Sequence, residues 1–133
     1  MVTYTIQVKG NQMTNEEFNE YFRKRTQKFA VAIIKFIEKI PFNNATRIMT
    51  YQLGKAGTSV GANHRAFCRA RSQNERFAKI CIVVEEADES IFWLEVFDET
   101  GYGDKNELRA LISENLEILK VTGTIKDGLY PNQ

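Results

Sequence analysis

Residues 14–41 read TNEEFNEYFRKRTQKFAVAIIKFIEKIP, and they give the clearest indication of the fold. It opens on a capping box, in which the Thr14 hydroxyl caps the third helical amide while Glu17 reaches back to the cap. Pro41 closes the stretch because proline cannot continue a helix. The apolar residues between them recur at helical spacing and form one stripe: Phe18, Phe22, Phe29, Ile33, Phe36 and Ile40. The segment therefore predicts a long amphipathic helix.

Similar start signals predict three more helices. Asn43 or Asn44 caps a second helix that runs to about Ala70, Ser72 opens a capping box for a third that ends near residues 100–101, and Asp104 caps a fourth. Because the connections are short, neighbouring helices should run antiparallel. We expect an all-α protein: an antiparallel up-down-up-down four-helix bundle over residues 14–122, with an N-terminal arm (1–13) and a C-terminal tail (123–133).

The N-terminal arm alternates apolar and polar residues from Val2 to Val8, a pattern that predicts a short extended strand. No other segment offers this strand an obvious partner. It is either an extended arm that docks on a neighbouring subunit or a tail without fixed structure, and the residues favour neither.

Composition indicates one globular domain, with 133 residues, 43% of them hydrophobic, and a net charge of +1. No apolar run approaches the ~20 residues that cross a bilayer. The N-terminus has no basic segment followed by an apolar one, so we expect neither a signal peptide nor a membrane association. The two cysteines follow no disulfide or metal-binding pattern. Together with the lack of an export signal, this favours a cytoplasmic protein.

Residues that carry catalytic or metal chemistry are scarce. The single histidine, His64, has no glutamate at the spacing of a di-iron motif. Cys68 and Cys81 lie on different predicted helices and are best interpreted as structural thiols. Residues 54–59 resemble a phosphate loop only superficially, since no strand precedes them. We therefore expect no enzyme activity, no cofactor, no metal and no small-molecule substrate.

The predicted second helix has an apolar face, a basic face and a stripe of three glycines between them. Gly54, Gly57 and Gly61 fall within about 60° of one another when projected at 100° per residue. Each glycine inside a helix costs up to ~1 kcal/mol relative to alanine. Three on one stripe indicate that another helix, or a ligand, approaches the backbone there.

The near-neutral total charge conceals two opposed segments. Residues 45–81 carry seven bases and one acid, net +6, whereas residues 82–117 carry two bases and eleven acids, net −9. Arginine-rich surfaces suit contacts with RNA or DNA phosphates. Alternatively, basic and acidic faces of different copies meet, or both are simply solvated. The candidate nucleic-acid-binding residues are Arg47, Lys55, Arg65, Arg69, Arg71 and Arg76.

The predicted third helix is apolar around more of its circumference than one bundle can cover. A second apolar set, interleaved with glutamates, accompanies the predicted apolar seam, which consists of Ile80, Cys81, Val84, Ala87, Ile91 and Leu94. Such an excess favours self-association, although these side chains could also cap the side of the bundle. The candidate interface comprises Ile82, Glu85, Glu89, Phe92, Trp93 and Val96.

A set of polar residues projects toward predicted helix contacts. Asp88 and Glu95 fall on the apolar seam of the third helix, and Arg25 lies within the stripe of the first. Because buried charges are normally paired, we hypothesise that Arg25 pairs with one of these two acids.

Three segments resemble one known family. Residues 52–65 (QLGKAGTSVGANHR) resemble its Q-L-x-x-S-G-T-S-I-G-A-N-x-x-E pattern. Residues 70–80 and 86–95 resemble its A-R-S-x-x-x-F-x-x-K and E-A-x-E-x-x-Y-W-L-E patterns. The family is named after reading frames in the intervening sequences of bacterial 23S rRNA genes, and an older name is ribosomal protein. Ala66 stands where the first pattern ends on an acid.

The resemblance covers roughly residues 18–118 and implies an antiparallel four-helix bundle that assembles as a homo-oligomer, a pentameric ring. It carries over no catalytic residue, because none is established for the family. Gln52, Ser59 and Asn63 match its polar positions, and we interpret them as an interhelical hydrogen-bond set. The bundle is also similar to the accessory protein of diversity-generating retroelements, a basic pentamer, which supports RNA or DNA binding by analogy.

Overall fold

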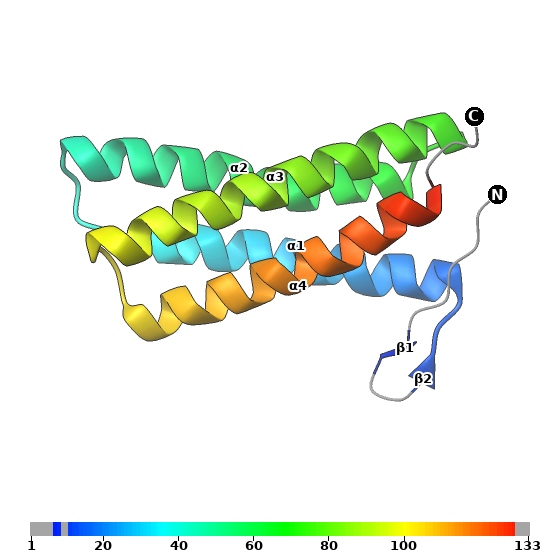
Figure 1. The fold of residues 1–133 in the computed structure, drawn as a ribbon, viewed down its shortest axis with the longest axis horizontal. Helices are drawn as coiled ribbons and strands as arrows, with labels where there is room; N and C mark the ends of the chain where they lie inside the picture. Colours follow the sequence, from blue (N-terminus) through cyan, green and yellow to red (C-terminus); the bar gives the residue numbers. More distant parts are fainter. Residues whose placement is uncertain (1–6, 9–10, 130–133) are drawn as a thin grey trace.

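The computed structural model describes residues 7–8 and 11–129 of the chain. Its elements are β1 (Gln7–Val8), β2 (Asn11–Gln12), α1 (Asn15–Glu38), α2 (Asn44–Cys68), α3 (Gln73–Thr100) and α4 (Lys105–Leu129). Each helix runs antiparallel to the next, and α1 packs against both α2 and α4 while α3 does the same from the other side (Figure 1). The predicted four-helix bundle is confirmed.

Local capping accounts for the helix starts. The Thr14 hydroxyl accepts from the Glu17 amide at 3.1 Å, and the Glu17 carboxylate accepts from the Thr14 amide at 3.2 Å. The Asn43 side chain accepts from the first-turn amides of α2. Asp104 caps α4 by accepting from the Glu107 amide at 2.8 Å. These short-range bonds explain why the expected helix starts agree with the structure.

Two predicted termini need correction. The C-terminal tail does not begin at residue 123, because α4 continues to Leu129, where Ile125 and Leu129 are buried in the core. The N-terminal strand is not partnerless over its described part, since β1 pairs antiparallel with β2. Residues 1–6, 9–10 and 130–133 lie outside the described residues, so docking of the arm stays a prediction.

The core contains the phenylalanines of α1 together with one buried row from each other helix. On α3 this row differs from the predicted seam, because Val83, Ser90 and Phe97 are buried whereas Cys81 and Ile91 are only half-buried. Ser90 tolerates burial because its hydroxyl donates to the Glu86 carbonyl at 2.8 Å. The buried row of α3 is Ile80, Val83, Ala87, Ser90, Leu94 and Phe97.

The glycine stripe of α2 lies against α1. A Cβ atom at Gly57 would sit 2.9 Å from Cγ1 of Ile33, and one at Gly61 would sit 3.1 Å from the backbone oxygen of Thr26. At Gly54 the nearest atom would be Cδ1 of Ile37, at 3.1 Å. Another helix, not a ligand, therefore occupies the side-chain-free stripe, and the two helices approach closely because of it.

His64 lies inside this contact between α1 and α2. Its side chain is fully buried, its ring centroid is 5.0 Å from that of Phe22 and 5.4 Å from that of Phe67, and neither nitrogen has a hydrogen-bond partner among the described residues. Burial lowers the pKa of His64 to about 4. The ring is therefore neutral near pH 7 and acts as a core aromatic.

We predict that Gly61→Ala destabilises the protein by about 1–3 kcal/mol, because the new methyl group meets the α1 backbone, which cannot move aside as a side chain could. Gly123→Ala is the matched control, since nothing lies within 4 Å of its added Cβ. The control should be neutral or more stable by up to ~1 kcal/mol. Urea unfolding followed by circular dichroism measures both, and equal stability of the two variants would contradict the close approach.

We predict a histidine-dependent loss of stability in mild acid. The pKa of His64 in the folded protein, about 4, lies below its ordinary value of 6.5, so the unfolded chain binds more protons between these values and stability falls as pH drops from 6.5 to 4. At pH 5 the loss should be roughly 2 kcal/mol relative to pH 7.5. His64→Leu should lack this component in paired urea titrations, and an identical pH dependence in both proteins would exclude it.

Candidate nucleic-acid interface

The six basic residues predicted from sequence do not form one compact site. Arg47, Lys55, Arg65, Arg69 and Arg71 are exposed, and Arg76 is half-buried at the start of α3. Along α2, Arg47 and Arg65 are separated by roughly 27 Å of helix rise. Arg65 lies in the last turn of α2. The remaining arginines come shortly after it in the chain, at positions 69, 71 and 76.

Lys55 lies on the side of α2 that faces α3. The pKa of the nearby Glu86 carboxyl is raised, mainly by burial and also by the negative charge of Glu89. The positive charge of Lys55 opposes this effect and lowers the pKa of Glu86. Lys55 is therefore close to the acidic part of α3 and is partly neutralised by it. It belongs to a different surface from Arg65.

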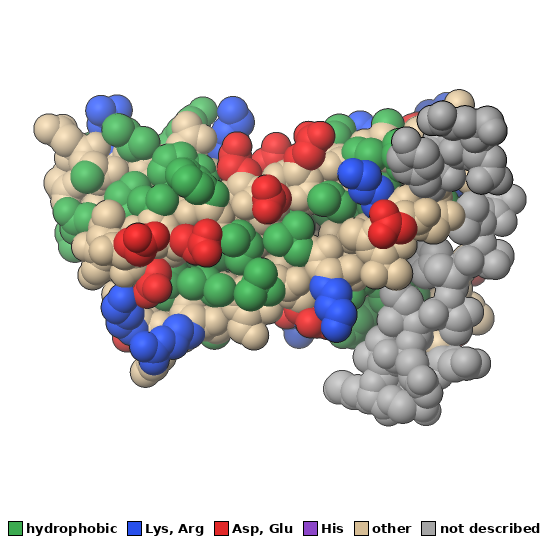
Figure 2. Space-filling view, in the orientation of Figure 1, with side chains coloured by type: hydrophobic (Ala, Val, Ile, Leu, Met, Phe, Trp, Pro, Cys, Tyr) green, Lys and Arg blue, Asp and Glu red, His purple; other side chains and the backbone are tan. Residues whose placement is uncertain are grey.

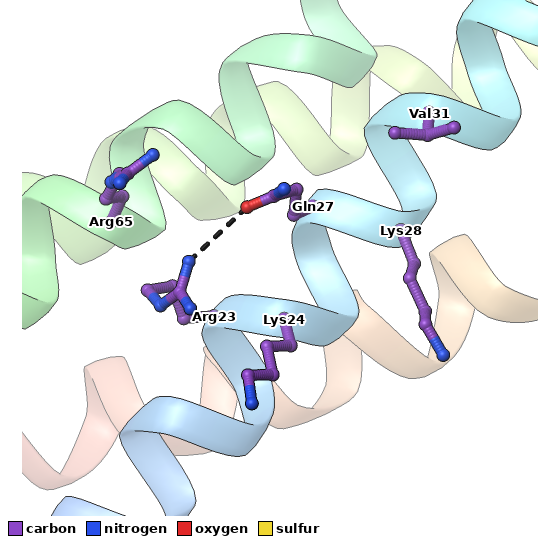
Figure 3. A pocket seen from close by; sticks show the side chains of 6 residues that line it. All are labelled: Arg23, Lys24, Gln27, Lys28, Val31 and Arg65. Carbon is purple, nitrogen blue, oxygen red and sulfur yellow. Dashed lines mark hydrogen bonds between the residues drawn. The ribbon is translucent and has the colours of Figure 1, made fainter.

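Arg65 meets three cations of α1 around a shallow depression of about 540 Å³. Figure 3 shows Arg65 projecting from α2 over the side of α1 that carries Arg23 and Gln27. The lining also includes Val31 and two lysines. We call the four basic residues the cationic cluster: Arg23, Lys24, Lys28 and Arg65.

The depression continues along the seam between α1 and α2. A smaller hollow of about 140 Å³ includes Thr58 and Gly61, and a third of about 350 Å³ extends to Ile34. Gln27 lines all three hollows. Val31 and Ile34 are 48% and 45% exposed, so the seam passes from a cationic end to an apolar end.

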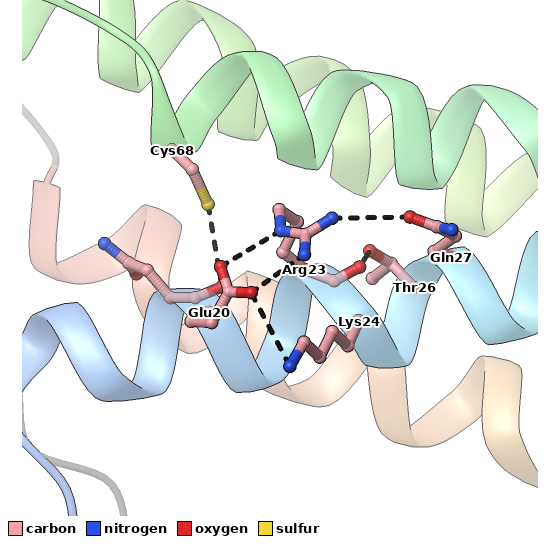
Figure 4. Close-up of polar contacts among 7 residues, drawn as sticks. Glu20, Arg23, Lys24, Thr26, Gln27 and Cys68 are labelled. Atoms are coloured by element: carbon pink, nitrogen blue, oxygen red, sulfur yellow. Dashed lines mark hydrogen bonds and ion pairs between the residues drawn. The ribbon is translucent and has the colours of Figure 1, made fainter.

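One acidic side chain, Glu20, contacts the cationic cluster (Figure 4). The Arg23 guanidinium donates to both Glu20 oxygens, from Nη2 at 2.8 Å and from Nε at 3.1 Å. Lys24 Nζ lies 3.8 Å from Oε1 of the same carboxylate. The hydrogen bond from Arg23 lowers the pKa of Glu20, and the charges of Lys24 and Arg65 act in the same direction. Four cations and one carboxylate leave this surface with a local net charge of +3.

The sequence prediction missed the α1 part of this cluster. Arg23, Lys24 and Lys28 belong to a segment whose summed charge is only +3, so counting by segment did not single them out. The sequence feature that could have identified these three cations is the run RKRTQK at residues 23–28. Three of its four basic residues lie on the outer side of α1.

Arg25, the fourth cation of that run, points elsewhere. Its guanidinium donates to Glu114 of α4, from Nε at 2.7 Å and from Nη2 at 2.8 Å. This bidentate pair raises the pKa of Arg25. The predicted pairing with α3 is wrong, because Asp88 and Glu95 are exposed and the acid that reaches Arg25 comes from α4.

The other predicted polar contacts are more local than expected. Gln52 and Ser59 are half-buried, and the Asn63 amide donates to the Ser59 carbonyl of its own helix at 2.9 Å. An interhelical bond that the prediction did not include comes from Asn115, whose amide donates to the Ala87 carbonyl at 2.8 Å. Together with Arg25, Asn115 connects α4 to the helices on either side of it.

The candidate interface residues of α3 lie away from its buried row, although Trp93 and Val96 pack partly against the core. Phe92 is 54% exposed, and its ring stands edge-on to Trp93 with centroids 5.0 Å apart. In Figure 2, hydrophobic side chains over this part of the bundle are flanked by acidic ones. Glu85 and Glu89 are exposed, whereas Ile82, Trp93 and Val96 are half-buried.

Other chemistry is limited within the part of the chain that the structure describes. These residues include no group of three or more His, Cys, Asp or Glu side chains that could hold a metal ion. Burial raises the pKa of the Cys68 thiol to about 11, so this cysteine is a poor nucleophile near neutral pH. None of the described helices is long and apolar enough to span a membrane.

Comparisons with known proteins give a consistent result. The family model described as 23S rRNA-intervening sequence protein matches residues 19–124. A solved structure from Bacteroides thetaiotaomicron VPI-5482, of a protein with unknown function from the S23 ribosomal protein family, is similar, with a TM-score of 0.73 and 27% sequence identity. The similarity covers 82% of this chain and 97% of that chain. No curated protein matches.

Proposed function

The chain belongs to the 23S rRNA-intervening sequence protein family, and on this premise we propose that it is a non-catalytic binding protein whose α1–α2 surface contacts the phosphates of RNA or DNA. The observation that carries the proposal is the cationic cluster, in which two helices bring four basic side chains to one depression. Phosphate backbones favour such a surface because each contact releases bound counterions.

The geometry of the cluster suits an extended polyanion better than a compact ligand. The depression is shallow, and Lys24, Lys28 and Arg65 are exposed around it. From Arg65 the basic path continues to Arg69, which caps the C-terminal end of α2, and to Arg71 in the connection to α3. Neither Arg47 nor Lys55 lines the depression, so we assign them at most peripheral contacts.

The hollows along the seam between α1 and α2 contain few side chains that could recognise bases. Their apolar lining consists of aliphatic side chains such as Val31 and Ile34, and no aromatic ring lines the three hollows. Stacking on aromatic rings is the usual means of holding unpaired bases. The proposed contacts are therefore with the backbone and carry little sequence preference.

A second candidate function is self-assembly through α3, favoured by the exposed Phe92 ring beside Trp93. Aromatic anchors surrounded by charge are typical of protein interfaces. The acidic surface of α3 complements the cationic cluster, so two copies could meet head to tail. A purely structural assembly of this kind needs no nucleic acid, and a pentameric ring stays a prediction from the family resemblance.

We predict that reversing charge in the cationic cluster weakens nucleic-acid binding. Lys28→Glu/Arg65→Glu should lower the affinity for a fluorescein-labelled RNA at least about tenfold and reduce the salt slope by about 1.5 to 2. Arg109→Glu/Lys120→Glu on α4 is the control with the same charge change. Fluorescence anisotropy at several salt concentrations provides the data. Equal losses in both variants, or no binding by the wild type at low salt, would refute the proposal.

We predict that Phe92→Glu abolishes self-association while the fold is kept, because half of this side chain is already in water. Light scattering should give a multiple of the 15.3 kDa chain mass for the wild type and one chain mass for the variant. Leu116→Glu is matched in exposure, at 53%, and should leave the assembly intact. A wild-type mass of one chain would remove assembly as a candidate function.

A further inference from the structure

Glu20 already occupies part of the cationic surface as an anion. Its carboxylate is the acceptor for both the Nε and Nη2 donors of Arg23, and it also lies near Lys24. Two of the four cations in the cluster therefore share one internal carboxylate. The side chain of Glu20 is 54% exposed, so the pair is open to water and to competing ions.

Arg23 is held in position without relying on Glu20 alone. Its side chain is only 23% exposed, and its Nη1 atom donates to Oε1 of Gln27 at 3.3 Å. If the carboxylate leaves, the guanidinium keeps its packing and the bond to Gln27. Its Nε and Nη2 edge, which now binds Glu20, then becomes free to bind another anion at the same place.

A phosphate group fits this edge by the same geometry. The guanidinium presents parallel N–H donors that pair in a bidentate manner with either a carboxylate or a phosphate. Exposed ion pairs contribute little to stability, and therefore the fold loses little when Glu20 is displaced. A phosphate of a polyanion has a further advantage over Glu20, because its neighbours along the strand can reach Lys28 and Arg65.

We propose that Glu20 is an exchangeable internal anion: a nucleic-acid phosphate replaces its carboxylate on Arg23 and Lys24 when the chain binds RNA or DNA. This inference rests on the proposed function and adds a competition at the same site. Glu20 weakens the binding of a nucleic-acid phosphate by occupying Arg23 and by repelling the negative charge of the strand. It thereby favours ligands with several phosphates, because contacts with the other cations of the cluster can compensate for the affinity that is lost at Arg23.

The test compares Glu20→Gln with Glu16→Gln in RNA-binding titrations. Both residues are exposed glutamates of α1, and Glu16 takes part in none of the ion pairs among the described residues. Glu20→Gln should bind a labelled RNA about fivefold more tightly than the wild type, whereas Glu16→Gln should change affinity less than about twofold. Equal gains in both variants would overturn the exchange, because long-range charge alone would explain them.

A double-mutant cycle shows whether the gain passes through Arg23. In the Arg23→Gln background the gain from Glu20→Gln should shrink to less than about twofold, since the contested donors are gone. An undiminished gain would overturn the exchange. Poly-glutamate serves as a second probe: if Glu20→Gln strengthens its binding as much as that of RNA, the site takes carboxylates as readily as phosphates and the phosphate assignment is wrong.

The outcomes separate this inference from the proposed function. If the wild type and all variants fail to bind RNA or DNA at low salt, both proposals fall. If the wild type binds with a steep salt dependence that Lys28→Glu/Arg65→Glu reduces, but Glu20→Gln behaves like Glu16→Gln, only the exchange falls. Circular dichroism of each variant should match the wild type, because Glu20 and Glu16 are exposed.

Discussion

The close approach of α1 to α2 determines how the bundle packs and where its cationic depression lies. It requires that three positions of α2 carry no side chain, most strictly Gly61, where an added Cβ would lie 3.1 Å from a backbone oxygen of α1. Because the helices come this close, Arg65 of α2 reaches the space beside Arg23 and Gln27 of α1 (Figure 3). Helices held farther apart would separate these side chains. The cationic depression is thus a consequence of the glycine stripe.

The same contact also explains how the bundle carries four neighbouring cations. Like charges on adjacent helices repel, and solvent weakens this repulsion only where the groups are exposed, as Lys24, Lys28 and Arg65 are. Arg23 is the least exposed of the four, and it is the one with a bidentate carboxylate partner. Glu20 therefore compensates charge where water is least able to do so, which is also where an incoming phosphate would gain most.

Capping patterns predicted the helix starts well because each depends on residues within four positions of one another, as at Thr14 and Glu17. Contacts between helices were predicted less well. A helical projection gives the direction of a side chain around its own axis but not which neighbour lies there, so Arg25 was assigned to α3 although α4 supplies Glu114. The buried row of α3 was missed in part because Ser90 satisfies its hydroxyl within the helix and so replaces an apolar residue.

The run Arg23-Lys24-Arg25 shows why the candidate site was only half predicted. Successive residues of a helix turn by 100°, so Arg25 points about 200° away from Arg23. One arginine consequently pairs with Glu114 in the contact with α4, while the other faces the depression shared with α2. A sum of charges over a segment adds these two together, although one is neutralised within the bundle and the other is available to a ligand. The charge that matters for binding is the charge of a face built by two helices, and that quantity exists only once the helices are packed.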